Sequence, residues 1–563
     1  MSAHLNRKIS PRLLRILLVF AICFVCGLVW YFFLYGRYPL YTSNVNWIYA
    51  TGGDTLKAQL GWEWFRQEPW HFPIGRIETY GYPVGTSLSF MDSIPLMAIL
   101  AKLVSPLLEA KFQYLGAWEL LSLVMQMFFG MLVLGEFTSS YLKRILGASL
   151  LVLSPVLLNR AFFHASLSAQ WILLAAIWFI ILEYRQKLWR WSWVAIFAIT
   201  MLIHLYFVAM LVPLWGISLF FRYRREKRYW RLAVDVLSVA GVILVMGYCL
   251  GLFGLSLNNL QESGFGYYSW NLNGFLNPIN NSAVINAIST NPDGGQYEGF
   301  SYLGLGNLFL IPIALILFLQ KDYSKKQLPF ILPVLIISVL LAWFSMSNKA
   351  FLNSQLLYNI HLPDQILKVV SMFRSSGRFI WPVYYFVILF GLISSIRNIR
   401  YTTPILILGI ILQLIDIQPM YSSKKQTAFG VYQSPLQSDF WQAAANVNAH
   451  VIVLPTTDTP ASLNAISIYA RQNNLTLNWG YFSRADENLI EDYSRHTWED
   501  LQAGKSDPQT IYIFWEPEFL EMVDETLDES MLVCTVDGYK IAISKDNPVN
   551  QSGIDLSNLC GVP

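Results

Sequence analysis

The segment LLRILLVFAICFVCGLVWYFFLY, residues 13–35, decides the fold class of this 563-residue chain. A helix of about 20 apolar residues crosses the roughly 30 Å hydrocarbon core of a bilayer. Cleaved signal peptides have a shorter apolar region that ends in small residues, whereas this run is long and ends in aromatic residues. We therefore predict a retained transmembrane helix. The basic residues Arg7, Lys8 and Arg12 before it predict a cytoplasmic N-terminus, because cytoplasmic flanks carry an excess of Lys and Arg.

The composition indicates that this helix is one of many. Hydrophobic residues make up 55% of the chain and charged residues only 13%, about half the charged fraction of a soluble domain. The chain also holds 20 Trp and 30 Tyr, residues that are enriched at membrane–water interfaces. These values predict a polytopic α-helical membrane protein whose partner is the lipid bilayer, and we expect no nucleic-acid partner.

Basic clusters fix the sides of the remaining spans if each cluster is cytoplasmic. The chain must then cross an even number of times between neighbouring clusters, which predicts about eleven spans with the N-terminus inside and the C-terminus outside. The segment Ile94–Leu108 is too short to span and has prolines near its ends, so we predict an interfacial helix on the outer face. The spans are predicted at Leu13–Tyr35, Gly116–Leu134, Leu146–Leu158, Leu167–Leu182, a tight pair between Arg190 and Arg222, Leu232–Phe253, Leu303–Leu319, Phe330–Phe344, Phe379–Ile393 and Thr403–Ile417.

The charge distribution divides the chain into a membrane module, residues 1–420, and a soluble domain, residues 421–563. The last 143 residues carry 8 Lys and Arg against 19 Asp and Glu, whereas the preceding residues carry 31 against 17. Such a split indicates two regions in different surroundings. With the predicted topology, the soluble domain is extracytoplasmic, and three long outer loops cover residues 36–93, 255–301 and 345–377.

Short apolar runs in the tail predict a small α/β domain. Its strands are predicted at VIVLP, IYIFW, MLVCTV and YKIAIS, and its helices at QSDFWQAAANV and ASLNAISIYARQNN. Its acidic residues suit a solvated face, although an acceptor-binding role stays open, and Arg471 and Arg484 are the basic positions to test first. Outside the cytoplasm Cys534 and Cys560 could pair, whereas the other cysteines lie in apolar runs.

Two aspartates in the first outer loop are candidate catalytic groups. Asp54 follows two glycines, which allow the backbone to approach a ligand closely, but it could also be the N-cap of a helix. Asp92 has the same ambiguity because it precedes the predicted interfacial helix. His71 and Glu78 lie in the same loop with no spacing that indicates a metal site. The sequence therefore names no cofactor, and a divalent metal stays an open alternative.

Basic residues at the outer ends of predicted helices are candidates for binding phosphate. Arg160 and His164 lie in NRAFFHASLSAQW, and Arg374 and Arg378 lie in FRSSGRFIWP. They could be side chains that snorkel to the interface. They could also bind a lipid phosphate, since a guanidinium group matches phosphate oxygens in a bidentate fork. His204, inside a hydrophobic hairpin, is either a functional or a structural histidine.

The order of these features resembles the GT-C superfamily of membrane glycosyltransferases, which use polyprenyl-phosphate-linked sugars. The strings GGDTLKAQLGWEWFR, DSIPL, NRAFFHASLSAQW, GFSYLGLG and FRSSGRFIWPVYY also resemble an uncharacterised family of bacterial multi-pass membrane proteins grouped near that superfamily. The resemblance implies that Asp54 deprotonates the acceptor hydroxyl and that Asp92 is a second acid. It implies a donor-phosphate or substrate site among the residues Arg160, His164, Arg374, Arg378, His71 and Tyr302. The chain lacks the paired Asp-Glu of protein O-mannosyltransferases and the Trp-Trp-Asp-type signature of oligosaccharyltransferases, which disfavours a protein acceptor.

These features predict an inverting glycosyltransferase in the bacterial cytoplasmic membrane. It would move a sugar from a polyprenyl-phosphate donor to a cell-envelope glycan or lipid acceptor on the extracytoplasmic face, with Asp54 as general base. One alternative is a flippase or polymerase of lipid-linked glycans, which should show charged residues along a path through the membrane. Another is a non-catalytic scaffold with an outer binding domain, which should tolerate replacement of Asp54.

Overall fold

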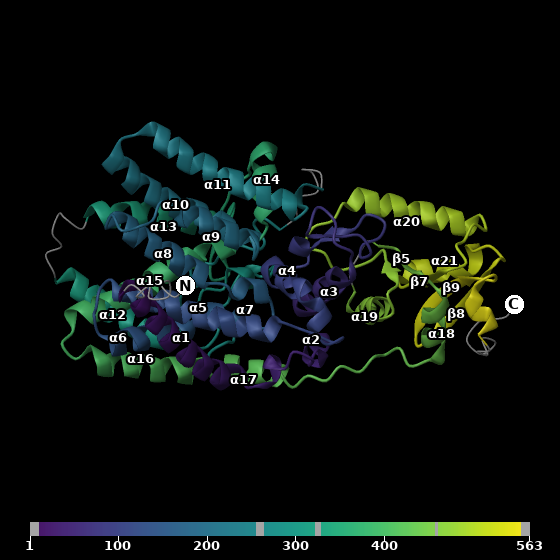
Figure 1. The fold of residues 1–563 in the computed structure, drawn as a ribbon, viewed down its shortest axis with the longest axis horizontal. Coiled ribbons are helices and arrows are strands. Elements are labelled where there is room, and N and C mark those ends of the chain that lie inside the picture. Colours follow the sequence, from purple (N-terminus) through teal and green to yellow (C-terminus); the bar gives the residue numbers. More distant parts are fainter. Residues whose placement is uncertain (1–10, 255–263, 321–327, 457–459, 553–563) are drawn as a thin grey trace, which may run out of the picture. The chain divides into compact units, whose positions relative to one another are not determined.

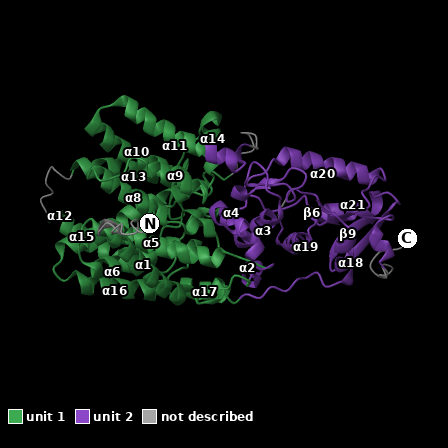
Figure 2. Ribbon diagram, in the orientation of Figure 1, with its two compact units in different colours: residues 1–44, 111–244, 261–429 green, residues 45–110, 245–260, 430–563 purple. Residues whose placement is uncertain are grey.

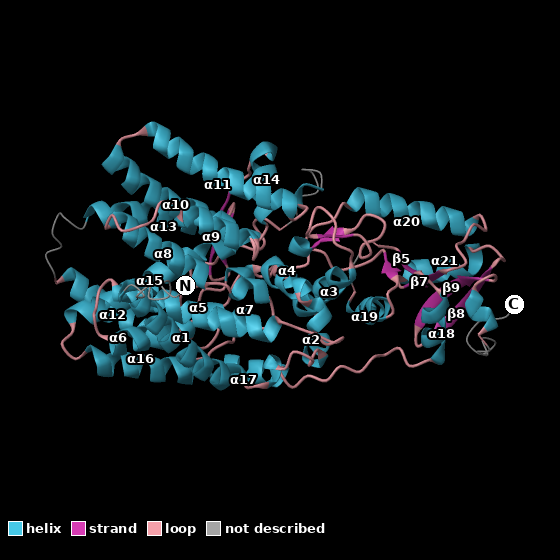
Figure 3. Ribbon diagram, viewed as in Figure 1, coloured by secondary structure: helices cyan, strands magenta, loops and turns pink. Residues whose placement is uncertain are grey.

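The computed structural model describes residues 11–254, 264–320, 328–456 and 460–552 (Figure 1). Most of these residues are helical, and strands are few (Figure 3). The chain forms two compact units that are described separately (Figure 2). Unit 1 comprises residues 1–44, 111–244 and 261–429, and unit 2 comprises residues 45–110, 245–260 and 430–563.

Unit 1 is a bundle of long apolar helices (Figure 1). Helix α5 packs against α1, α6 and α8, and α12 packs against α15 and α16. The third long connection of the chain, which follows α13, holds a hairpin of strands β3 (Lys349–Leu352) and β4 (Gln355–Asn359) and helix α14 (Asp364–Val370). The helices that begin in this unit are α1 (Pro11–Tyr35), α5 (Leu115–Gly135), α6 (Tyr141–Val152), α7 (Pro155–Arg160), α8 (Trp171–Tyr184), α9 (Ser192–Met201), α10 (Leu205–Glu226), α11 (Tyr229–Cys249), α12 (Leu305–Leu319), α13 (Leu328–Met346), α15 (Trp381–Asn398), α16 (Thr402–Asp416) and α17 (Gln418–Thr427).

Seven helical segments in the described residues are long and apolar enough to cross a membrane, and an eighth is possible if the bent pair α16 and α17 forms one span. The other apolar helices are shorter: α6 has 12 residues, α9 has 10 and α12 has 15. The prediction of a polytopic helical protein is therefore confirmed, but the count of eleven spans is not. The hydropathy of the sequence does locate the helices. Some of the predicted spans are interrupted, so that the helices within them are shorter than the thickness of a membrane.

The outer helices of the bundle expose apolar side chains instead of polar ones. Leu237 on α11 is 70% exposed, and Val339 on α13 is 59% exposed. A soluble protein would not surround its helices with such surface, because large exposed apolar patches promote association. In a bilayer this surface meets lipid chains of the same polarity. The inner helix α8 is in contrast almost wholly buried within the protein.

The predicted interfacial segment forms helix α4 (Pro95–Leu103) and a following 3-10 turn at Ser105–Leu107. Nine residues at 1.5 Å each extend about 14 Å, so α4 cannot cross a bilayer. Its start differs slightly from the prediction: Ile94, at φ 50°, occupies the N-cap position, and Pro95 fills the first turn.

Unit 2 is built on a five-stranded mixed sheet in the order β6-β5-β7-β9-β8. Strands β6, β5 and β7 are parallel, and β9 and β8 are antiparallel. The central strands read as unbroken apolar runs because helices cover the sheet, as is usual for parallel strands. The elements of this domain are α18 (Asp439–Val447), β5 (His450–Leu454), α19 (Asn464–Gln472), β6 (Thr476–Leu477), α20 (Glu487–Gln502), β7 (Thr510–Phe514), α21 (Pro517–Thr526), β8 (Met531–Val536) and β9 (Tyr539–Ser544).

The predicted small α/β domain is thus confirmed, with all four predicted strands and both predicted helices. Helices α20 and α21 supply Leu501 and Val523 to a buried cluster on the sheet that also contains Tyr512 and Phe514. The predicted pairing of Cys534 with Cys560 stays a prediction, because Cys560 lies outside the described residues.

The first long loop belongs to the same unit as this domain. It contains α2 (Asn46–Thr51), α3 (Gly53–Gln67) and a small pair of strands, β1 (Arg76–Ile77) and β2 (Thr86–Ser87). Tyr80 extends the sheet next to β6: Leu477 N donates to Thr79 O at 3.1 Å, and Gly81 N donates to Leu477 O at 2.8 Å. The Tyr80 ring also stacks on Trp64 at 5.0 Å. Residues 45–110 are therefore held by the C-terminal domain through both backbone and aromatic contacts.

Candidate functional site

Asp54 lies in the first turn of α3. The N-cap position belongs to Gly52, whose φ of 67° lies in the left-handed region that favours glycine. The alternative that Asp54 is the N-cap therefore does not hold. An acidic side chain in the first turn still interacts favourably with the positive end of the helix dipole, so Asp54 is electrostatically suited to its place.

Lys57, one turn further along α3, joins the two candidate aspartates. Its Nζ lies 2.9 Å from a carboxylate oxygen of Asp54 and 2.7 Å from one of Asp92. The ammonium group is buried, with its side chain only 3% exposed. The structure thus brings together two residues that are far apart in the first loop, and it does so through a lysine that the sequence analysis did not single out.

Residues of the C-terminal domain complete this group. Ser483 Oγ accepts a hydrogen bond from Lys57 Nζ at 3.1 Å and donates one to Asp92 at 3.1 Å. The Tyr481 ring lies 4.7 Å from Lys57 Nζ in a cation–π contact. We call Asp54, Lys57, Asp92 and Ser483 the carboxylate cluster; its three ionisable groups sum to a formal charge of −1.

The electrostatics of the carboxylate cluster keep its lysine charged. Burial lowers the pKa of the Lys57 ammonium, but the Asp92 and Asp54 carboxylates oppose this effect and raise the pKa above its ordinary value. The ammonium therefore supplies positive charge between the two carboxylates. Asp92 itself is held at a φ of 54°, a conformation that an aspartate adopts more readily than most residues.

A second buried group, in unit 1, joins two of the candidate arginines. Arg160 Nη2 donates to Glu298 Oε2 at 2.8 Å, and Arg378 donates from Nε and Nη2 to the two oxygens of Glu298 at 2.8 and 2.9 Å. We call these three residues the arginine cluster; they sum to a formal charge of +1. Arg378 thus makes with Glu298 the bidentate pair that guanidinium geometry favours.

Burial distinguishes the arginine cluster from an interfacial feature. Arg160 is 1% exposed and Arg378 is 6% exposed, so the alternative that they snorkel to a membrane interface does not hold for these two. Their heads lie against Trp381 and Tyr206, respectively. Burial alone would raise the pKa of Glu298, but the charges of Arg160 and Arg378 lower it well below its ordinary value.

His164 lies beside the arginine cluster in a loop that α5 holds in place. Its backbone N donates to Arg160 O at 2.8 Å, and its ring centroid is 5.8 Å from that of His204. The loop is fixed by Glu119, which accepts hydrogen bonds from Phe162 N at 3.2 Å and from Ser168 Oγ at 3.0 Å. Sequence analysis missed Glu119 and Glu298, although a buried acid in an apolar helix is a signal that could have marked Glu119.

Three other candidates belong to neither of the two defined clusters. Arg374 places its head over the Tyr268 ring at 5.4 Å and is partly exposed. Tyr302 donates to Asp416 at 2.8 Å, which ties α16 to the start of α12. His71 lies partly exposed in the loop after α3 and makes no hydrogen bond or ion pair with any residue of the described ranges.

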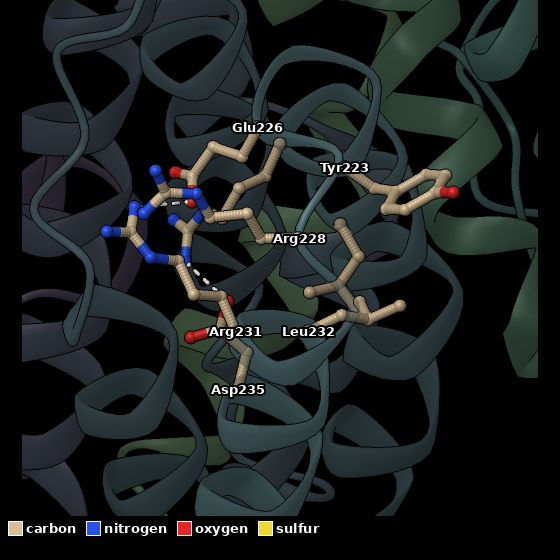
Figure 4. Close-up of a pocket in the computed structure, with 8 residues that line it drawn as sticks. Tyr223, Glu226, Arg228, Arg231, Leu232 and Asp235 are labelled. Carbon is tan, nitrogen blue, oxygen red and sulfur yellow. Dashed lines mark hydrogen bonds and ion pairs between the residues drawn. The ribbon is translucent and has the colours of Figure 1, made fainter.

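A further ionic group occupies one end of α8, α10 and α11 in unit 1. Arg222 pairs with Glu183 and with Asp235, and Arg190 also pairs with Asp235 at 2.9 Å. The adjacent pocket is lined by Glu226 and Arg231, which form the ion pair drawn in Figure 4. Its volume of about 10 Å³ corresponds to one water molecule. These charges therefore hold helix ends together and do not form a substrate pocket.

Comparisons with known proteins give the following matches. Residues 24–418 match the family described as "Domain of unknown function (DUF6311)", and residues 440–544 match the "DUF6311 C-terminal domain". A sequence search among curated proteins finds no match. Among solved structures, the chain is similar to ArnT from Cupriavidus metallidurans bound to undecaprenyl phosphate, with a TM-score of 0.45 and 12% identity over 94% of this chain and 97% of that chain.

Proposed function

The chain belongs to the DUF6311 family, and we propose that it transfers a sugar from a polyprenyl-phosphate donor to an acceptor hydroxyl at the outer face of a membrane. One observation carries the proposal: the chain buries two ionic clusters of opposite formal charge. The carboxylate cluster is suited to take up a proton, and the arginine cluster is suited to bind a phosphate group. Helices able to span a membrane are also present, which a lipid-linked donor requires.

The reaction follows from these charges. The Asp54 carboxylate accepts the proton of the acceptor hydroxyl as the oxygen forms a bond to the anomeric carbon of the donor sugar. The bond between that carbon and the phosphate oxygen breaks, and the electron pair leaves with the polyprenyl phosphate. Attack from the face opposite the phosphate inverts the anomeric centre. A positioned general base typically contributes about 10²–10⁴-fold to such a rate.

The other residues have supporting roles in this proposal. Lys57 and Asp92 hold Asp54 in position, and Asp92 is the second carboxylate of the site. Arg160, His164, Arg374 and Arg378 stabilise the phosphate, where negative charge builds in the transition state. His71 and Tyr302 remain candidates for contacts with the sugar or the lipid.

The proposal includes a topology. Each of the eleven predicted apolar segments contains a helix, and we count all of them as crossings, the short helices α6, α9 and α12 included. With eleven crossings, the N-terminus lies in the cytoplasm and the C-terminal domain lies outside a bacterial cytoplasmic membrane. The acceptor is then a glycan or lipid of the cell envelope.

The test compares the wild type with Asp54→Asn in the producing cells. We expect Asp54→Asn to lower transfer by at least 100-fold, so that the polyprenyl-phosphate sugar accumulates and the product glycan disappears, as measured by mass spectrometry of extracted lipids and envelope glycans. Asp500→Asn, which replaces an exposed acid of the same unit, is the matched control. Wild-type levels of donor and product in Asp54→Asn would contradict the proposed enzymatic activity and favour a non-catalytic scaffold.

A flippase would give a different result in the same experiment. The buried acids Glu183 and Asp235 are paired with arginines at one end of their helices. Asp416 is bonded by Tyr302, and Glu119 on α5 is bonded by Phe162 N and Ser168 Oγ. They do not form a continuous charged path in the described spans, which favours transfer over transport. A flippase without transfer would leave the donor chemically unchanged in the wild type as well.

A further inference from the structure

A pocket in unit 2 adjoins the carboxylate cluster through Ser483 and Arg484, which are consecutive in the chain. It has a volume of about 260 Å³ and lies between the 76–90 segment of the first loop, Gly251, and the start of α20. Small-molecule pockets are typically about 300–1,000 Å³, so this one has room for a sugar-sized group but not for a lipid-linked sugar with its tail.

Two arginines give the pocket its charge. Arg76 is anchored by a hydrogen bond from Nη2 to Val84 O at 2.8 Å, and Arg484 by one from Nη1 to Ser483 O at 2.7 Å. Each guanidinium carries five N–H donors in a planar fork, and the anchoring bond holds the head at the pocket wall. Asp486 also lines the pocket, and the three ionisable side chains of the lining sum to a formal charge of +1. Glu78, which is not part of the lining, lies 3.7 Å from Arg76 Nε.

Asp486 has a defined structural role at the pocket wall. Its side chain accepts a hydrogen bond from Leu489 N at 3.3 Å and is the N-cap of α20. Asparagine is as good an N-cap as aspartate. The negative charge of Asp486 can therefore be removed without removal of the cap, which makes this position useful as a test of the pocket's preference for anions.

The pocket wall is continuous with the carboxylate cluster. Arg484 follows Ser483, which is hydrogen-bonded to both Lys57 and Asp92. The backbone N of Ser483 donates to Phe90 O at 2.8 Å, and Phe90 also lines the pocket. A ligand in the pocket would thus contact the same two chain segments that hold the candidate base.

We propose that this pocket binds an anionic sugar, that is, a sugar carrying a phosphate or carboxylate group, as part of the acceptor. The arginines recognise the anionic group in bidentate fashion, and the Asp486 carboxylate on the same wall repels it. The assignment as acceptor rests on the proposed function, whereas the binding of an anionic sugar does not.

The binding test uses the full chain in detergent micelles and isothermal titration with glucose 6-phosphate, glucose and inorganic phosphate. We expect glucose 6-phosphate to bind at least 10-fold more tightly than either of the other two probes. Arg76→Gln and Arg484→Gln should each weaken it at least 10-fold, whereas Arg495→Gln, an exposed arginine on α20 that pairs with Asp492, should not. Asp486→Asn should strengthen the binding of glucose 6-phosphate.

Equal binding of glucose and glucose 6-phosphate, or unchanged binding in both arginine variants, would overturn the inference. If inorganic phosphate binds as tightly as glucose 6-phosphate, the assignment of the ligand as a sugar is wrong. The fold of each variant is checked by its melting temperature, and Asp486→Asn provides a change of opposite sign that a loss of folding cannot imitate. If glucose 6-phosphate does not bind but transfer still depends on Asp54, only this inference is wrong. If glucose 6-phosphate binds but transfer does not depend on Asp54, only the proposed function is wrong.

Discussion

At the residue scale, the two ionic clusters show how a buried charge is kept in this protein. Lys57 is surrounded by two carboxylates and a hydroxyl, and Glu298 is surrounded by two guanidinium groups. Each central residue satisfies its partners by direct hydrogen bonds, which is the condition under which a buried charge is tolerated. Removal of a central residue should therefore be more damaging than its own contacts suggest, because two charges lose their partner together.

Lys57→Met should destabilise unit 2. Removing one partner of a buried ion pair typically costs about 3–5 kcal/mol, and here the two remaining carboxylates also repel one another. The measurement is thermal unfolding of the detergent-solubilised protein. Lys505→Met serves as the control, since that lysine is 76% exposed and its contact with Asp500 is long, at 3.8 Å. Equal melting temperatures for the two variants would show that Lys57 is not a structural centre.

Glu298→Gln should remove a pH-dependent contribution to stability. The arginines depress the pKa of Glu298 well below its ordinary value of 4.5, so the stabilisation is fully present above about pH 4.5 and is lost as the pH falls through the depressed pKa. The difference in unfolding free energy between wild type and variant should therefore be constant near neutral pH and shrink under acidic conditions. A difference that grows on acidification would contradict the assignment, and Glu499→Gln is the exposed control.

These residues also mark the limit of what the sequence could predict. Asp54, Asp92, Arg160 and Arg378 were identified because an acid after glycines, or a basic group at a helix end, is visible locally. Lys57 was not, because its role depends on Asp92 and Ser483 lying beside it. Glu298 was missed for the same reason: its partner Arg160 is 138 positions away, and no local pattern reports that pairing.

At the element scale, hydropathy predicted where helices and central strands lie, and it failed for amphipathic surface elements. The strand runs VIVLP and IYIFW are buried on both faces and therefore lack polar alternation, which made them easy to recognise. Helix α20, ENLIEDYSRHTWEDLQ, is mostly polar and was not predicted. Spans also proved harder to count than to locate, since α9 and α12 are helical but shorter than a full membrane crossing.

Helix α4 carries an element-scale prediction about pH. Lys102 near its end donates to Phe65 O at 2.7 Å, and burial lowers its pKa to about 8 although Glu68 acts in the opposite direction. The folded protein then loses this proton at a lower pH than the unfolded chain, whose lysines titrate near 10.5. Stability should therefore rise from about pH 8 toward pH 10.5 relative to Lys102→Met. Parallel pH profiles of melting temperature for the wild type and Lys102→Met would contradict this prediction.

At the scale of the whole molecule, the chain combines lipid-facing helices with a domain built for water. The first loop and the C-terminal domain form one compact unit although more than 300 residues separate them in the sequence. The sequence did not predict this association, because the backbone bonds between Thr79, Gly81 and Leu477 are long-range pairings. The association places the carboxylate cluster on a folded support instead of a free loop.

The topology gives a prediction for the intact cell. In a variant without natural cysteines, Lys505→Cys in unit 2 should react with a membrane-impermeant maleimide added from outside. Arg224→Cys, at the exposed end of α10, should react only after the membrane is opened. The readout is mass-tagged protein on a gel. Labelling of Arg224→Cys alone in intact cells would reverse the proposed orientation.

The central claim is that the protein acts on a sugar linked to a polyprenyl phosphate. Native mass spectrometry of the protein purified from its own membranes tests this claim most directly, because it detects a lipid that stays bound. We predict a bound species with the mass of a polyprenyl phosphate or its glycosylated form, which added undecaprenyl phosphate displaces and which Arg160→Gln with Arg378→Gln reduces. A spectrum that contains bulk phospholipids alone, unchanged by added undecaprenyl phosphate, would contradict the claim.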